Sequence, residues 1–195
     1  MEAAAGVAPI VHYREVAFMG IVSVVKNLGK LTRIGRQIQA AMRDFAPDVV
    51  IPVDYADFNF RFILPYAKKE LRCPVIYYIL PKLWAWRAGR IRQLRRYVDL
   101  GLSILPFETS YFSDRGLRTE YIGNPCVDAK LTYLAEHPEP VEREQMLLLV
   151  PGSRQSELRD NLPEMLVATA AYSQLGWRVV IAGAPGLTAA DYADR

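Results

Sequence analysis

The sequence lacks the residues that build metal sites and disulfide frameworks. It has two cysteines and two histidines among 195 residues. Cys73 and Cys126 lie far apart and show no CxxC spacing, so neither a zinc site nor a set of disulfides is indicated. We expect both cysteines to be reduced thiols of the core in a cytoplasmic protein.

Long apolar runs are also absent. No stretch approaches the ~20 apolar residues that span a bilayer, and the N-terminus lacks the basic start and unbroken apolar core of a signal peptide.

The charge of the chain is nearly balanced: the net charge is +3, with 51% hydrophobic and 23% charged residues. This composition is typical of a globular protein, permits an anionic partner without requiring one, and leaves peripheral contact as the expected kind of membrane contact.

Short apolar runs alternate with segments of helical periodicity. Strands are predicted at residues 48–53, 75–80, 99–106, 119–123, 146–150 and 177–183, with those at 48–53 and 146–150 expected to be buried. Helices are predicted between them at residues 22–45, 61–71, 86–98, 108–114 and 156–176, the last interrupted or kinked near Pro163. This alternation indicates an α/β fold with a parallel sheet covered by helices on both faces.

Residues 128–145 differ in character from the rest of the chain. They are polar, contain two prolines, and show no periodicity beyond a first helical turn or two. We therefore predict a first domain over residues 1–135, a linker over 136–145 and a second domain over 146–195.

The helix predicted at residues 22–45 allows two interpretations. Its apolar side chains recur every three or four residues up to Phe45, which places them on one face. This face either packs on the core, with a solvated basic back, or lies near anionic lipid. Phe18 and Ile21, just ahead of the helix, favour the second interpretation.

Two acids follow the first predicted strand. A buried carboxylate is costly unless it is paired, so Asp54 and Asp57 are expected on the loop at the end of this strand, where α/β proteins place their chemistry. In one interpretation Asp54 deprotonates a substrate hydroxyl. In the other, Asp57 caps the next helix and Asp54 pairs with a nearby arginine.

Polar residues follow other strands too. Glu108 in "ILPFE" and Asn124 in "YIGNP" would share the sheet edge of Asp54 if the strands are parallel. The segment "KLWAWR" combines Trp84 and Trp86 with a basic helix. These tryptophans either bind a sugar, lipid headgroups or nucleic acid, or pack between elements.

The segment "PGSR" connects a strand to a helix in the second predicted domain. Gly152 allows a close backbone approach, Ser153 can cap the helix, and Arg154 can add a charged fork to a phosphate held by the free N–H groups. The alternative is an ordinary capped turn, with Ser153 or Ser156 as the cap and Glu157 in the first helical turn.

Five segments, in order, resemble the lipid-A-disaccharide synthases, which are bacterial glycosyltransferases of the GT-B type: "VDYADFNFR", "KLWAWR", "ILPFE", "YIGNP" and "LVPGSRQSE". The resemblance implies an acceptor-side Rossmann-like domain, incomplete at its N-terminus, followed by the beginning of a nucleotide-sugar-binding domain. The implied enzyme is an inverting hexosyltransferase. It joins UDP-2,3-diacylglucosamine to 2,3-diacylglucosamine 1-phosphate through a β(1→6) linkage and releases UDP.

The resemblance also implies site residues. Asp54 would activate the acceptor 6-hydroxyl, with Asp57 and Asn59 as its supporting shell, and Arg154 would assist a phosphate-bearing substrate. The expected substrate-binding residues are Asp57, Asn59, Trp86, Arg87, Glu108, Asn124, Gly152, Ser153 and Glu157. No metal or cofactor is expected, because the sequence offers no ligand cluster and donors at a helix terminus can offset the charge of a leaving group.

The chain departs from the family pattern in places. "LPKLWAWR" stands where "SPSVWAWR" is common, and "GNP" stands for "GHP". Family members begin ahead of Met1 and continue past Arg195, so we expect this chain alone to be inactive.

The implied partners are the two lipid substrates and the cytoplasmic face of the bacterial inner membrane, contacted peripherally; a homodimer is allowed. No nucleic-acid partner is expected, because basic and aromatic residues are not interleaved along strands. Two other interpretations stay open. One is a different UDP-sugar transferase or epimerase of the GT-B type, and the other is a non-catalytic peripheral module that binds anionic lipid.

Overall fold

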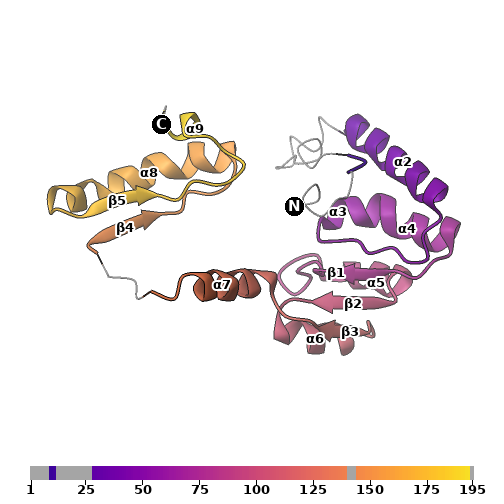
Figure 1. Ribbon diagram of the computed structural model, residues 1–195. Helices are drawn as coiled ribbons and strands as arrows, with labels where there is room; N and C mark the ends of the chain where they lie inside the picture. Colours follow the sequence, from indigo (N-terminus) through magenta and orange to yellow (C-terminus); the bar gives the residue numbers. More distant parts are fainter. Residues whose placement is uncertain (1–8, 12–27, 140–143, 194–195) are drawn as a thin grey trace. The chain divides into compact units, whose positions relative to one another are not determined.

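The computed structural model describes residues 9–11, 28–139 and 144–193. The chain forms two compact units, Met1–Glu136 and His137–Arg195, which we describe separately as the first and the second unit (Figure 1). Both combine parallel strands with helices, so the predicted α/β class is confirmed.

The first unit contains a parallel sheet. Its strands β1 (Ile76–Tyr78), β2 (Leu100–Ser103) and β3 (Thr119–Tyr121) lie side by side in that order (Figure 1). Residues 50–53 run parallel to β1 on its other side and are joined to it by two isolated bridges. Segment 50–53, β1 and β2 arise from apolar runs of the sequence, whereas β3 has the sequence Thr-Glu-Tyr.

The buried strand predicted at residues 48–53 is only partly present. Val50 and Val53 form the bridges, and Pro52 accepts a hydrogen bond from the Tyr78 N–H at 2.9 Å. Proline has no N–H to return to a ladder, which limits regular pairing at this position. Ile51 and Val53 are more than half exposed, so the prediction of burial is wrong for them.

Helices connect and follow the strands of the first unit. Their bounds, in chain order, are α2 (Leu28–Phe45), α3 (Ala56–Phe58), η3 (Asn59–Ile63), α4 (Leu64–Tyr66), η4 (Ala67–Leu71), η5 (Ala88–Arg90), α5 (Ile91–Tyr97), α6 (Pro106–Ser113) and α7 (Pro125–Glu136). The α7 helix is longer than the one or two turns expected after residue 128.

Residues 56–71 form one helical run, which begins five residues before the predicted start. It alternates between α-type and π-type turns, with Pro65 inside the short α4 segment between the two π-type segments. Because proline lacks an N–H and its ring crowds the carbonyl four residues earlier, an uninterrupted α-helix is disfavoured at this point. The earlier start places Asp57 in the first turn of this run.

The α2 helix packs on residues 56–71. Leu31 and Ile34 form a buried cluster with Phe58 and Ile63, which supports the core-facing interpretation of this helix, although Phe45 at its end is exposed. Gly35 lies against Phe62 so closely that an added Cβ would be 2.4 Å from the Phe62 ring. The start of the predicted helix and the residues Phe18 and Ile21 lie outside the described residues.

The main core of the first unit joins the sheet to its helices. Its fully buried side chains include Leu64, Val75, Tyr77, Leu94 and Phe112. Burial of an aliphatic or aromatic side chain of this size contributes about 1.5–3 kcal/mol.

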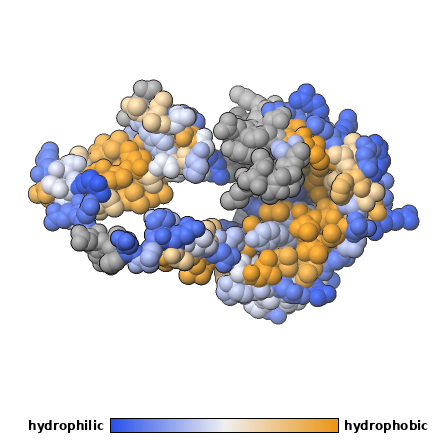
Figure 2. All heavy atoms as spheres, in the orientation of Figure 1, coloured by the Kyte–Doolittle hydropathy of each residue, from blue (hydrophilic) through white to orange (hydrophobic). Residues whose placement is uncertain are grey.

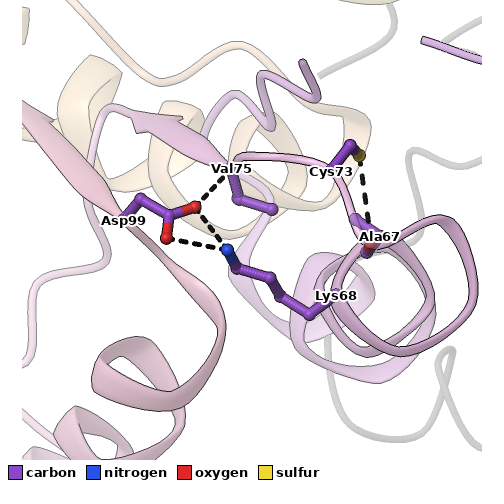
Figure 3. Close-up of polar contacts among 5 residues, drawn as sticks. All are labelled: Ala67, Lys68, Cys73, Val75 and Asp99. Carbon is purple, nitrogen blue, oxygen red and sulfur yellow. Dashed lines mark hydrogen bonds and ion pairs between the residues drawn. The ribbon is translucent and has the colours of Figure 1, made fainter. Parts of the chain in front are cut away.

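A polar contact ties η4 to the sheet (Figure 3). Lys68 Nζ lies 2.6 and 2.7 Å from the two carboxylate oxygens of Asp99, and the Val75 N–H donates to Asp99 at 2.7 Å. Partial burial on its own would raise the pKa of Asp99, but the Lys68 ammonium and the Val75 N–H together hold it below its usual value.

The two cysteines have different surroundings. Both are free thiols, and Cys73 is buried, as predicted, with its Sγ 3.8 Å from the Ala67 carbonyl (Figure 3). Cys126 is exposed, so its assignment to the core is wrong. It lies on α7, in which no residue is buried.

The second unit is a βαβ arrangement. Its elements are β4 (Met146–Leu149), α8 (Gln155–Gln174), β5 (Arg178–Ile181) and a short helix, α9 (Ala190–Ala193), with β4 and β5 paired in parallel. The α8 helix continues through Pro163, so the alternative of an interruption there is wrong.

The β4 strand is not buried on both faces, in contrast to the prediction. Leu158 and Leu162 of α8 are fully buried, whereas Met146 and Leu148 of β4 are exposed. Figure 2 shows apolar atoms at the surface of this unit. None of the helices formed by the described residues has both the length and the hydropathy to cross a bilayer.

Candidate active site

The carboxyl ends of the parallel strands meet at one edge of the first unit. Segment 50–53, β1, β2 and β3 are followed there by loops and first helical turns at residues 54–57, 79–90, 104–108 and 122–124. The predicted placement of Asp54, Glu108 and Asn124 on a common sheet edge is therefore confirmed. Ligands of open α/β sheets bind at this kind of edge.

Asp54 has an unusual backbone conformation. Its φ is 43°, and that of Tyr55 is 39°, so two consecutive non-glycine residues lie in the left-handed region. The left-handed conformation raises the free energy of the folded state by roughly 1–2 kcal/mol for each such residue, and by less for aspartate than for tyrosine. The Asp54 N–H donates to the Tyr78 carbonyl at 3.0 Å, and the Asp54 carbonyl accepts hydrogen bonds from Tyr77 Oη and Asn59 Nδ2, both at 2.6 Å.

The Asp54 carboxylate itself is exposed. It accepts no hydrogen bond and forms no ion pair with any residue that the structure describes. A carboxylate in this state has its lone pairs open to a substrate hydroxyl, which is what a general base requires.

Tyr77 and Asn59 are the buried support of Asp54. Burial, foremost, raises the pKa of Tyr77 to about 12, although the Asn59 hydrogen bond lowers it. The Tyr77 hydroxyl therefore stays protonated at neutral pH and can donate. Asn59 is also buried, with its Nδ2 3.3 Å from Tyr77 Oη, so its amide faces the backbone of Asp54.

Asp57 differs from Asp54 in its partners. Arg87 Nη1 lies 3.0 Å from Asp57 Oδ1, and Arg90 forms a second ion pair with the same oxygen. The interpretation in which Asp54 is the paired acid and Asp57 the helix cap is therefore wrong, because the arginines pair with Asp57. Exposed pairs of this kind contribute roughly 0–1 kcal/mol each, but they connect the first loop to the second.

Glu108 holds the tryptophan loop, residues 79–90, through Trp84. It is 1% exposed, accepts a hydrogen bond from Trp84 Nε1 at 3.0 Å, and lies 2.9 Å from Ser103 Oγ. The Trp84 ring also packs edge-on against Phe107, with a centroid distance of 5.1 Å. Glu108 was expected to bind substrate, but its oxygens face protein groups and are closed to solvent.

Trp86 and Arg87 form the exposed rim of the same loop. Trp86 is 60% exposed, and the Arg87 guanidinium carbon lies 4.2 Å from its ring centroid. A cation over an indole face is worth about 0.5–1 kcal/mol at an exposed site. The pair presents a flat aromatic surface and a cation beside Asp57, which suits a sugar or phosphate ligand.

Asn124 caps the α7 helix. Its Oδ1 accepts a hydrogen bond from the Cys126 N–H at 3.0 Å, and its carbonyl accepts one from the Val127 N–H at 2.8 Å. This is the geometry of an asparagine at a helix N-cap. The Asn124 amide nitrogen is the part of this side chain that can still donate to a ligand.

The "PGSR" loop of the second unit already holds a carboxylate. The Ser153 N–H donates to Glu157 Oε2 at 2.8 Å, and Arg154 forms an ion pair with Glu157 Oε1. The Ser153 N–H, foremost, and the Arg154 guanidinium lower the pKa of Glu157. The Glu157 side chain, rather than that of Ser153 or Ser156, therefore accepts a hydrogen bond from the backbone N–H ahead of α8. It lies at the position where the sequence predicts a bound anion.

Gly152 is required by this loop. Its φ is +125°, and an added Cβ would lie 2.5 Å from Glu157 Cβ. Only glycine meets both conditions without strain. The loop is thus folded closely around the Glu157 side chain.

Metal ligands are not clustered in the part of the chain that the structure describes: no three histidine, cysteine, aspartate or glutamate side chains are gathered for an ion there.

Three residues of the site were not predicted from the sequence. Tyr77 lies in an apolar strand that reads as core, and Arg90 is one of many cations in a basic helix. Ser103 carried a signal, because it is a polar residue inside the apolar run "LGLSIL" and is fully buried in the structure.

Comparison with known proteins identifies the family. Residues 1–178 match the lipid-A-disaccharide synthetase family. The lipid-A-disaccharide synthase of Myxococcus xanthus is 38% identical over 190 residues, which cover 94% of this chain and 49% of that protein. The enzymes of the same name from Acidobacterium capsulatum and Trichlorobacter lovleyi are 36% and 31% identical, over 96% and 87% of this chain and 47% and 45% of their own lengths.

The chain spans about half the length of the curated relatives it matches. Since the family match extends over nearly the whole chain, and the predicted α/β architecture is present, the chain belongs to the lipid-A-disaccharide synthetase family, a family of GT-B glycosyltransferases.

Proposed function

We propose that the whole protein is an inverting glycosyltransferase of lipid A biosynthesis. It transfers diacylated glucosamine from UDP-2,3-diacylglucosamine to the 6-hydroxyl of 2,3-diacylglucosamine 1-phosphate and releases UDP. Membership of the lipid-A-disaccharide synthetase family supports this reaction. The observation that carries the assignment of the base is the unpaired Asp54 carboxylate at the strand-end edge.

Asp54 acts as the base of the transfer. Its carboxylate takes the proton of the acceptor 6-hydroxyl while that oxygen forms a bond to C1 of the donor sugar. The bond between C1 and the UDP oxygen breaks from the opposite side, so the configuration at C1 inverts. Asp57 is the weaker candidate for this role, because two arginines already occupy its carboxylate.

The remaining residues hold the substrates. Asn59 and Glu108 act through other groups: Asn59 supports Asp54, and Glu108 supports Trp84. Trp86, Arg87 and Asn124 line the acceptor side, and Asp57 holds Arg87 in place. This division makes residues 1–135 the acceptor-side domain and 136–145 the linker.

Arg154 binds a substrate phosphate in the second domain, which begins at residue 146 and holds the nucleotide sugar. A phosphate at the start of α8 would meet the Ser153 N–H and the Arg154 guanidinium, the two groups that now bind Glu157. Binding of phosphate therefore requires Glu157 to move or to share these donors. Gly152 allows the backbone to approach closely.

The protein acts at the cytoplasmic face of the inner membrane as a peripheral protein. Both substrates carry acyl chains, so the active site must reach a lipid surface. Three arginines of α5 line a shallow hollow that would attract anionic headgroups: Arg92, Arg95 and Arg96.

The test uses an extended protein, in which residues 1–195 are joined to the remaining residues of the Myxococcus xanthus relative. The two lipid substrates are supplied in detergent, and the product is identified by mass and by linkage. We expect a β(1→6) disaccharide 1-phosphate with stoichiometric UDP release, and no product with an acceptor that lacks the 6-hydroxyl. A folded protein that binds vesicles of anionic lipid but forms no disaccharide would refute the proposal and favour the lipid-binding module. Turnover of only a different UDP-sugar would favour another GT-B enzyme.

A further inference from the structure

The loop that carries Asp54 is held by a feature that its own sequence does not reveal. Asp54 and Tyr55 are both left-handed, and neither is a glycine. Such a conformation persists only where its surroundings enforce it. The groups that enforce the left-handed conformation here are hydrogen-bond donors outside residues 54 and 55.

Two buried donors converge on a single acceptor, the carbonyl oxygen of Asp54. Tyr77 Oη and Asn59 Nδ2 both lie 2.6 Å from it. A carbonyl oxygen has two lone pairs, so these two donors satisfy it completely. Tyr77 has no exposed surface and Asn59 is 6% exposed, so water cannot readily replace either donor.

The two donors come from different elements. Tyr77 lies in the middle of β1, and Asn59 is the first residue of η3. The Asp54 carbonyl is thereby fixed against both the sheet and the helix that follows the loop. Its N–H is fixed to the sheet too, through the Tyr78 carbonyl.

We propose that Tyr77 is a positioning residue for the glycosyl transfer: with Asn59, its hydroxyl holds the Asp54 carbonyl and so keeps the left-handed loop that presents the Asp54 carboxylate to the acceptor. The inference rests on the proposed function, because it takes Asp54 as the base. Tyr77 does not touch substrate in this account. It acts on the geometry of Asp54 alone.

Removal of the hydroxyl should allow the loop to relax toward an ordinary backbone conformation. A displacement of about 1 Å at a catalytic group can lower a rate by about 10²-fold. For Tyr77→Phe in the extended protein we expect kcat to fall about 10–100-fold while KM for both substrates stays within about twofold. A role in stability alone would lower the melting temperature and leave kcat of the folded enzyme unchanged.

Tyr78→Phe is the matched control. Tyr78 is the next residue of the same strand, and its hydroxyl makes no hydrogen bond to any part of the chain that the structure describes. Its kcat should equal that of the unsubstituted enzyme. If Tyr77→Phe fails to fold, Asn59→Ala removes the other donor and should give the same fall in kcat.

A second measurement separates this inference from the proposed function. In the 195-residue chain, the ¹³C chemical shift of the Asp54 carbonyl reports its hydrogen bonds directly. Tyr77→Phe should move this signal upfield, and Tyr78→Phe should not. A shifted signal in a protein whose extended form has no transferase activity would overturn the proposed function and, with it, the role in transfer, but would leave the contact itself established. An unshifted signal, or kcat within twofold of the parent in Tyr77→Phe, would overturn the inference.

Discussion

Asp54 and Asp57 lie three residues apart, yet their carboxylates have different surroundings. Asp57 pairs with two guanidinium groups, whereas the contacts of Asp54 are made by its backbone. A base must have a free lone pair, whereas Asp57 already binds both guanidinium groups through Oδ1. The same short segment thus presents one exposed carboxylate without a side-chain partner among the described residues, that of Asp54, and, three residues later, the acid that attaches residues 79–90.

Glu108 should be a structural acid, and its removal tests this. Glu108→Ala leaves the Trp84 indole N–H without its partner, whereas the buried Ser103 hydroxyl keeps its contact with the Leu105 carbonyl. An unsatisfied buried polar group costs about 1–3 kcal/mol, so we expect urea unfolding to show a loss of stability of this size. Glu120→Ala, which removes an acid from an exposed pair with Arg118, should change stability by less than about 1 kcal/mol. Equal effects of the two substitutions would contradict the buried role of Glu108.

Asp99 should make stability depend on acid pH. Its pKa is lowered in the folded state, so its contribution is fully present above the unfolded pKa of about 3.9 and is lost as the pH falls through the folded value. Because the Asp99 side chain is 50% exposed, we expect Asp99→Asn to cost no more than about 1 kcal/mol at pH 7. The difference between the two proteins in unfolding free energy should shrink between about pH 5 and pH 2. A difference that stays constant over this range would mean that the Lys68 contact does not stabilise the fold.

At the scale of elements, the contact between α2 and residues 56–71 depends on a glycine, Gly35. Gly35 lies directly against the Phe62 ring, whereas an added Cβ at Gly29 would meet nothing within 4 Å. Both glycines belong to α2, which makes them a matched pair.

Gly35→Ala should therefore destabilise the chain by about 1–3 kcal/mol, the usual cost of overpacking. Gly29→Ala should be neutral or stabilising by up to about 1 kcal/mol, because alanine favours helix more than glycine does. Thermal unfolding followed by circular dichroism measures both. Equal melting temperatures for the two variants would show that α2 does not pack on Phe62 as described.

At the scale of the whole molecule, the alternation of apolar runs and helical periodicity was enough to predict an α/β fold with parallel strands. The parallel order then predicted that Asp54, Glu108 and Asn124 share one edge. Burial was predicted less well: an apolar run such as 48–53 reads as core, but Pro52 weakens its pairing and Ile51 is exposed.

Of the groups that support the site, Asn59 was expected beside Asp54, but Tyr77 and the partners of Asp57 could not be predicted, because they depend on contacts between distant residues. Tyr77 donates across 23 positions, and Arg87 reaches Asp57 across 30. The sequence predicts a ligand at Glu157, but in the structure its carboxylate accepts a hydrogen bond from the Ser153 N–H. Local patterns predict the elements; side-chain partners follow from how the elements meet.

The kcat of Asp54→Asn in the extended protein tests most directly whether the Asp54 carboxylate is the base of the transfer, as we propose. Asparagine keeps the size of the side chain and removes its basicity, so we expect kcat to fall about 10²–10⁴-fold with the fold and KM retained. Asp48→Asn, at the start of the same apolar run and away from the loop edge, is the control and should retain full activity. An Asp54→Asn enzyme that keeps more than a tenth of the parent kcat would contradict this assignment and mean that another group is the base.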